Sequence, residues 1–118
     1  MSNNSIEVIE GLDYLPITEL NLANNRIKTL SGLSNLSNLS ALNVAGNQIS
    51  SLAPLAAINT LSFLDVRDNL LAHIRQVEFL REIPWLYVLL MSGNPAAKKE
   101  HYRYSITNIL VKALMLLL

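Results

Sequence analysis

The chain has 118 residues, no cysteine, and equal numbers of basic and acidic residues, nine of each. This length accommodates one domain, and a content of 51% apolar residues is enough to fill a core and argues against a disordered chain. The zero formal net charge provides no long-range field for nucleic acid or an anionic membrane, and the lack of cysteine excludes disulfides, thiolate metal sites and thiol nucleophiles.

The first predicted element, residues 1–16, is half of a larger unit. After Asn4 its apolar residues recur every three positions, at Ile6, Ile9, Leu12 and Leu15. The same spacing of three follows Asn25, Asn47 and Asn69 later in the chain. We therefore expect residues 1–16 to form a partial amino-terminal repeat. No positive charge precedes an apolar stretch in the first residues, and no signal peptide is predicted.

Residues 17–94 consist of one repeated unit. An asparagine recurs at Asn25, Asn47, Asn69 and Asn94, with spacings of 22, 22 and 25 residues. Each follows an apolar run of the pattern L-x-x-L-x-L, centred on Leu20, Leu42, Leu64 and Leu89. This period and pattern together are typical of a leucine-rich repeat. We therefore predict an α/β fold, a right-handed solenoid with parallel strands on its concave face and 3₁₀ or helical returns on its convex face.

The four repeated asparagines are predicted to be structural. Each stands where the chain leaves its strand, so its side-chain amide can bond backbone groups of its own turn and of the adjacent repeat. Each of those groups would cost about 1–3 kcal/mol if it were buried without a partner.

The segments after the asparagines return along the convex side. In the first two returns, apolar residues every third position favour tight 3₁₀-like turns. The third return is three residues longer, and residues 74–83 contain Glu, Arg and Gln before Pro84. These residues favour helix and Pro84 ends it, so we expect an α-helix there.

Residues 95–118 start at the turn formed by Gly93, Asn94 and Pro95, and they contain the run K-K-E-H-Y-R at positions 98–103. This segment resembles the carboxy-terminal cap of the 22-residue-period leucine-rich repeat family, which includes phosphatase regulatory proteins, an axonemal dynein light chain and a spliceosomal protein. The resemblance implies a cap helix on which Tyr102 covers the last core layer. The chain departs from the family pattern after Val111, so we expect a truncated cap. The apolar end, residues 109–118, is shorter than the about 20 residues that cross a bilayer.

The sequence does not indicate an enzyme. His73 and His101 have no acid, base or nucleophile at a suitable spacing, and no metal or phosphate motif is present. The basic residues Lys98, Lys99 and Arg103 are interleaved with an acid and are interpreted as a solvated surface. We predict no cofactor and no direct nucleic acid binding; RNA contact through a partner protein stays open because one family member is spliceosomal.

The concave face carries the candidate binding site. Strand alternation turns the residues on either side of each middle leucine outward. In the carboxy-terminal half these are apolar or charged, and we predict Phe63, Val88 and Leu90 as anchors, with Asp65 and Arg67 fixing the orientation of a partner. The alternative is that the cap or the apolar tail covers Val88 and Leu90, leaving only Phe63 exposed.

The predicted function is a non-catalytic protein-interaction module, either a scaffold or a regulatory subunit. The alternative is a structural or self-associating repeat fragment that uses the apolar residues 113–118. The resemblance implies a phosphatase catalytic subunit, dynein or tubulin as partner, and a eukaryotic protein in the cytoplasm, with the cilium and the nucleus as alternatives. No membrane association is predicted.

Overall fold

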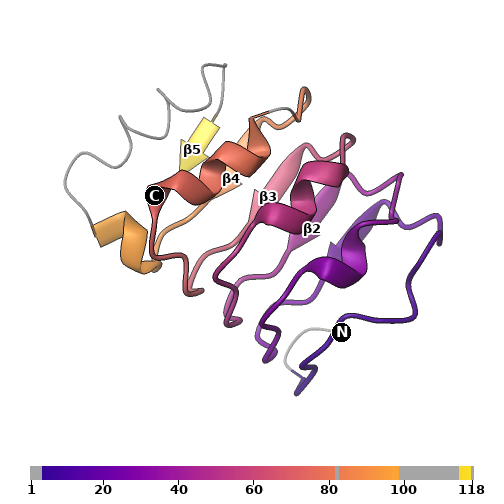
Figure 1. Ribbon diagram of the computed structural model, residues 1–118, viewed down its shortest axis with the longest axis horizontal. Helices are drawn as coiled ribbons and strands as arrows, with labels where there is room; N and C mark the ends of the chain where they lie inside the picture. The colour runs from indigo at the N-terminus through magenta and orange to yellow at the C-terminus, as the bar shows by residue number, and fades with distance from the viewer. Residues whose placement is uncertain (1–3, 82, 99–114, 118) are drawn as a thin grey trace.

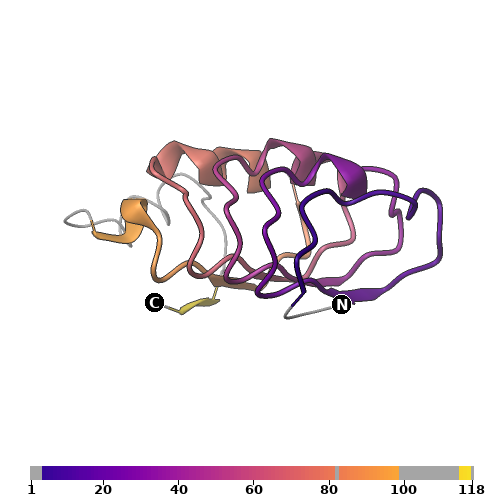
Figure 2. The ribbon, with the colours of Figure 1, turned by 90° about the horizontal axis from the view of Figure 1, so that it is seen from below.

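The computed structural model describes residues 4–81, 83–98 and 115–117. One parallel sheet has the strand order β1-β2-β3-β4-β5. Its strands are β1 (Glu19–Asn21), β2 (Ala41–Asn43), β3 (Phe63–Asp65), β4 (Val88–Leu90) and β5 (Met115–Leu117). The 3₁₀ helices are η1 (Ser31–Leu33), η2 (Ala53–Ala57), η3 (Ile74–Leu80) and η4 (Pro95–Lys98). Figures 1 and 2 show the strands in one layer and η1, η2 and η3 in a second layer, which confirms the predicted α/β solenoid.

The register places equivalent positions of the repeats side by side. Leu20 pairs with Leu42, Leu42 with Leu64, and Leu64 with Leu89 across the three junctions of β1 to β4. A slip of one residue would turn these leucines to the outer face, because side chains alternate along a strand. The sequence pattern therefore fixes which side of the sheet faces the core.

The core is one continuous cluster that runs through all the repeats. Every third residue of the returns contributes to it, and most of these side chains are fully buried, among them Ile27, Leu30, Leu33, Ile49, Leu52, Leu55, Leu71, Val77 and Leu80. The first layer is less covered: Ile17 and Leu20 are only partly buried, whereas Leu42 and Leu64 are inaccessible to solvent. Burial therefore increases from the first repeat to the inner ones, as stacking of neighbours requires.

The repeated asparagines connect each repeat to the one before it. The Nδ2 group of Asn47 donates to the carbonyl oxygens of Val44 at 2.9 Å and Leu22 at 3.0 Å, and its Oδ1 accepts the N–H of Ile27 at 3.0 Å. Asn69 and Asn94 make the equivalent bonds one and two repeats later. The side-chain amides thus satisfy buried backbone groups of two turns, as expected, and their effect on stability stays a prediction.

The residue before each of these asparagines has a left-handed backbone. The φ angles are 59° at Asn24, 70° at Gly46, 55° at Asp68 and 79° at Gly93. Glycine adopts this conformation freely, and Asn and Asp tolerate it better than most residues. At Gly46 a Cβ atom would also lie 2.3 Å from Oδ1 of Asn24 in the previous turn. The residue before each repeated asparagine, which is Asn, Gly, Asp and Gly in turn, is therefore a turn signal that recurs once in every repeat.

The prediction of an α-helix over residues 74–83 is wrong, because the return contains η3, a 3₁₀ helix over Ile74–Leu80. The apolar residues Leu71, Val77, Leu80 and Ile83 are all buried, and they keep the spacing of three. A helix with 3.0 residues per turn holds such positions on one face, whereas 3.6 residues per turn would rotate them away from the core. Burial of this face outweighs the helix propensity of Glu, Arg and Gln.

The predicted cap helix over residues 95–118 is also corrected in part. Met115–Leu117 form β5, which pairs with β4 and extends the sheet by one strand. A parallel partner satisfies the backbone groups along the edge of β4, which a helix could not do. Tyr102 and the basic residues Lys99 and Arg103 lie outside the described residues. In the described ranges no helix has the length and apolarity needed to span a bilayer.

Candidate protein-docking surface on the sheet

The face of the sheet opposite the core carries two rows of side chains, which we call the outer sheet face. The first row is Glu19, Ala41, Phe63 and Val88, and the second is Asn21, Asn43, Asp65 and Leu90. Both rows are in register across β1 to β4, as the strand alternation predicts. We call the outward residues of β1 and β2 together with Phe63 the amino-terminal half of this face, and Asp65 with the outward residues of β4 the carboxy-terminal half.

In the carboxy-terminal half, Asp65 is bound by a residue of its own chain. Its Oδ1 accepts the backbone N–H of Arg67 at 3.1 Å and the Nε–H at 2.9 Å, while Oδ2 accepts from Nη2 at 2.7 Å. The Asp65 side chain is only 2% exposed, whereas that of Arg67 is 48% exposed. These hydrogen bonds and the carboxylate charge raise the pKa of Arg67 above its ordinary value. Asp65 is therefore a support for Arg67 and has little surface left for a partner.

The prediction that Leu90 is an exposed anchor is wrong. Leu90 is 9% exposed although it stands in an outward row. In the register of the sheet, β5 lies beside β4, and Leu117 is the backbone partner of Leu90. Val88, in the other row, is half-buried. The alternative from the sequence, that the cap or the tail covers Val88 and Leu90, stays a prediction.

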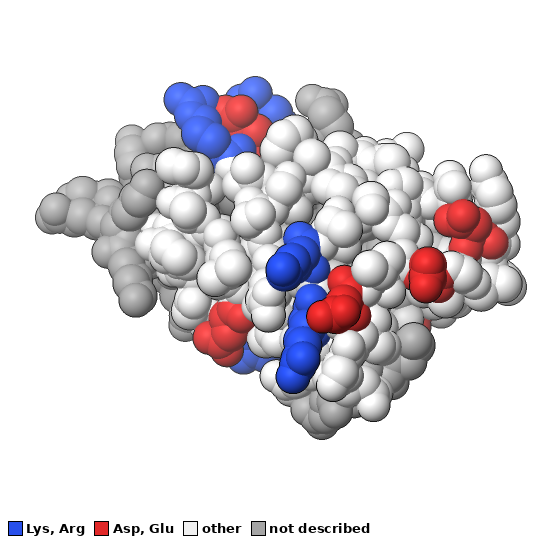
Figure 3. Space-filling model, turned by 60° about the horizontal axis from the view of Figure 1, so that its bottom comes forward, with Lys and Arg blue, Asp and Glu red and all other residues white. Residues whose placement is uncertain are grey.

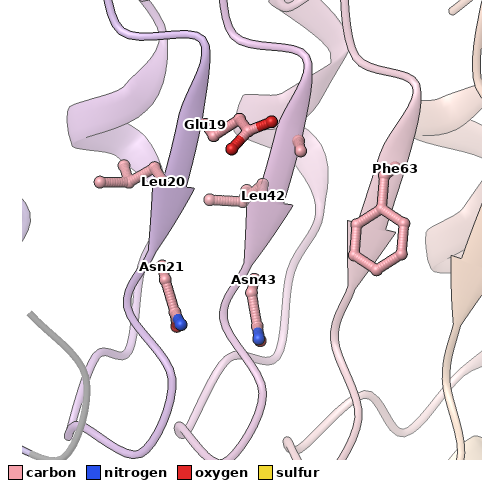
Figure 4. A pocket seen from close by; sticks show the side chains of 7 residues that line it. Glu19, Leu20, Asn21, Leu42, Asn43 and Phe63 are labelled. Atoms are coloured by element: carbon pink, nitrogen blue, oxygen red, sulfur yellow. The ribbon is translucent and has the colours of Figure 1, made fainter.

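The amino-terminal half contains a hollow of about 330 Å³. It extends across β1, β2 and β3, and its lining residues are Glu19, Leu20, Asn21, Ala41, Leu42, Asn43 and Phe63. Figure 4 shows the Glu19 side chain extending from β1 toward β2, with the Phe63 ring on the far strand. A volume of this size is at the lower end of the range of small-ligand sites and holds one or two side chains of a partner.

Two asparagine side chains in the hollow have one bonded end and one open end. Oδ1 of Asn21 accepts the N–H of Ala23, and Oδ1 of Asn43 accepts that of Ala45, both at 3.0 Å. These bonds fix the orientation of each amide and turn its Nδ2 group away from the backbone. Figure 4 shows the two amides lying parallel at the ends of their strands. Neither Nδ2 group has an acceptor among the described residues, so both are available to donate.

Glu19 is the one ionised side chain that lines the hollow, and it is exposed. It takes part in neither of the ion pairs among the described residues, which are Arg67–Asp65 and Arg75–Glu78. From residue 30 to residue 64 the chain has no charged side chain at all. In Figure 3 the charged side chains accordingly form separate clusters with uncharged surface between them. The Glu19 carboxylate is therefore without an ion-pair partner in the part of the chain that the structure describes.

The hollow shares only Phe63 with the site residues predicted from the sequence. Phe63 is half-buried and forms the wall on β3. Three polar residues, Glu19, Asn21 and Asn43, were not predicted as site residues. Strand alternation already placed these three residues in the outward rows. The prediction preferred large apolar side chains, most of which lie in the carboxy-terminal half. No group of His, Asp or Glu that could hold a metal ion occurs within the described ranges.

Comparison with known proteins agrees with this architecture. Residues 17–59 match a family model described as leucine-rich repeats in two copies. No curated protein matches the sequence. The structure is similar to the crystal structure of the Drosophila melanogaster SNF/U2A' complex, with a TM-score of 0.72 and 22% identity over 84% of this chain and 58% of the matched chain.

Bacterial proteins share the fold as well. An internalin (inlF) from Listeria monocytogenes gives a TM-score of 0.63 with 28% identity, covering 85% of this chain and 28% of that chain. An internalin C2 (inlC2) from the same organism gives 0.62 with 26% identity, covering 82% and 40% respectively. The chain thus spans less than two thirds of each of these matched chains.

Proposed function

Because the chain folds as a leucine-rich repeat solenoid, we propose that it is a non-catalytic docking module that binds another protein on the amino-terminal half of its outer sheet face. Leucine-rich repeat domains generally mediate contacts between proteins. The proposal places the binding surface over β1, β2 and β3, with Phe63 as the apolar anchor. It does not depend on Val88 or Leu90.

The observation that carries the proposal is the set of unused groups around the hollow. Nδ2 of Asn21, Nδ2 of Asn43 and the Glu19 carboxylate have no partner among the described residues, and a half-buried ring stands beside them. In a protein interface, an aromatic anchor provides affinity, and a few polar groups around it orient the partner. In the carboxy-terminal half, by contrast, both carboxylate oxygens of Asp65 are already bonded to Arg67.

The sequence resemblance suggests which partners to assay first. These are a phosphatase catalytic subunit, dynein and tubulin, and we propose the cytoplasm as the compartment. A scaffold role and a regulatory role would use the same surface. Self-association through residues 113–118 is the competing proposal.

The test is affinity capture from an extract of the source cells with three forms of the protein: the unaltered chain, Phe63→Asp and Phe79→Asp. Phe63 and Phe79 are the two phenylalanines of the chain; Phe63 lines the hollow and Phe79 is exposed on η3. Each substitution adds the same charge, so Phe79→Asp is a matched control. We expect a protein retained by the unaltered chain and by Phe79→Asp but lost with Phe63→Asp.

Thermal unfolding of the three forms shows whether the variants are folded. Loss of the partner with both variants, or with neither, would contradict the outer sheet face as the binding surface. The oligomeric state, measured by light scattering with and without residues 113–118, separates docking from self-association. A dimer that dissociates on removal of the tail would favour the competing proposal.

A further inference from the structure

We propose that the hollow is a receptor for an arginine side chain of the partner, held between the Glu19 carboxylate and the Phe63 ring above Ala41. This inference rests on the proposed function and adds the chemistry of the occupant. It follows from three properties of the hollow: its spacing, the kinds of atoms that line it, and its uncompensated charge.

The spacing comes from the register of the first outward row. Glu19, Ala41 and Phe63 are direct neighbours on three consecutive strands. Adjacent strands lie about 4.8 Å apart, so the first and third positions are separated by roughly 10 Å. Ala41 fills little of this space because its side chain is one methyl group. A single flat side chain fits between the carboxylate on one side and the ring on the other.

The lining atoms favour arginine over lysine. A guanidinium offers two parallel N–H groups to a carboxylate and can stack its plane on an aromatic ring at the same time. An ammonium group is a compact point charge that does neither as well. The amide Nδ2 groups of Asn21 and Asn43 cannot bond a guanidinium, which has no acceptor. They suit the main-chain carbonyl oxygens of an extended peptide that carries the arginine.

The charge of the hollow favours a cationic occupant. Glu19 has no counter-ion among the described residues. Arg67, which follows the end of β3 by two residues, is engaged by Asp65. An acidic peptide would bring a like charge toward Glu19, whereas an arginine supplies the missing opposite charge. The carboxylate therefore selects for a basic segment and against an acidic one.

The experiment is selection from a random-peptide display library on four proteins: the unaltered chain, Glu19→Gln, Glu19→Lys and Glu10→Lys. Glu10 is also exposed, but it lies outside the hollow, so Glu10→Lys is the charge-matched control. We expect arginine to be enriched at one peptide position with the unaltered chain and with Glu10→Lys. The enrichment should disappear with Glu19→Gln and change to Asp or Glu with Glu19→Lys.

A second measurement uses one selected peptide in which the arginine is replaced by citrulline, which has nearly the same shape but no charge. Its Kd should be at least tenfold higher on the unaltered chain, and the difference should vanish on Glu19→Gln. Equal binding of both peptides would overturn the inference.

The two proposals fail in different ways. Peptides that need Phe63 for binding but show no arginine preference would overturn the arginine receptor and leave the docking surface intact. If no selected peptide depends on Phe63, the docking surface itself is wrong and the inference falls with it.

Discussion

The two halves of the outer sheet face have equivalent strand positions, but they differ in which hydrogen-bonding groups remain available to a partner. Asn21, Asn43 and Asp65 occupy one row, and each accepts the N–H of the residue two positions later. In the amino-terminal half that later residue is alanine, and the Nδ2 group of each asparagine has no acceptor among the described residues. At Asp65 it is Arg67, whose side chain takes up the remaining carboxylate capacity. Whether an outward residue can bind a partner thus depends on its neighbour two positions along the chain.

The largest expected effect separates the core from the outer sheet face. Leu64→Ala should lower the free energy of unfolding by about 2–5 kcal/mol, because Leu64 is fully buried and the substitution leaves a cavity. Phe63→Ala should cost clearly less, because the adjacent ring is only half-buried. Chemical denaturation of both variants measures the difference. Equal losses would mean that the two side chains do not face opposite sides of the sheet.

The next effect concerns the carboxy-terminal half. Asp65→Ala should lower the free energy of unfolding by about 1–3 kcal/mol, because the guanidinium and the N–H of Arg67 lose their acceptor. Asn43→Ala removes one such bond, and about 1 kcal/mol is expected. The two variants are compared by urea denaturation. A greater loss for Asn43→Ala would reverse the roles assigned to the two halves.

A third prediction converts one half into the other. The double substitution Asn43→Asp with Ala45→Arg copies the Asp65–Arg67 arrangement onto β2. Position 43 is half-buried whereas Asp65 is buried, so the added ion pair should contribute only about 0–1 kcal/mol and the free energy of unfolding should change little. Binding of a selected peptide should nevertheless weaken by more than tenfold, because an arginine now lies beside the hollow. Peptide affinity measured by fluorescence polarisation tests this, and unchanged affinity would place the binding surface elsewhere.

The smallest effect is expected at Glu19. Glu19→Gln should change the free energy of unfolding by less than about 0.5 kcal/mol, because the exposed carboxylate has no partner among the described residues. Thermal unfolding at neutral pH is a sufficient measurement. A larger loss would show that the carboxylate supports the fold and is not held free for a ligand.

The sequence predicted those features that one repeat unit determines. The spacing of the leucines and asparagines was enough to predict the parallel strands, their register and the hydrogen bonds of the repeated asparagine side chains. Features that depend on contacts beyond the unit were missed. The period of three overrode helix propensity in η3, and Leu90 is buried although it stands in an outward row. The hollow depends on how far side chains extend across neighbouring strands, which alternation alone does not specify.

The most direct test of the central claim is an NMR titration of the protein with a peptide selected on it. We expect the side-chain NH₂ signals of Asn21 and Asn43 to shift on binding, while the Nε–H signal of Arg67 stays in place because Asp65 accepts its hydrogen bond. A shift of the Arg67 signal with unchanged Asn21 and Asn43 signals would contradict the account, since it would place the partner on the carboxy-terminal half of the outer sheet face.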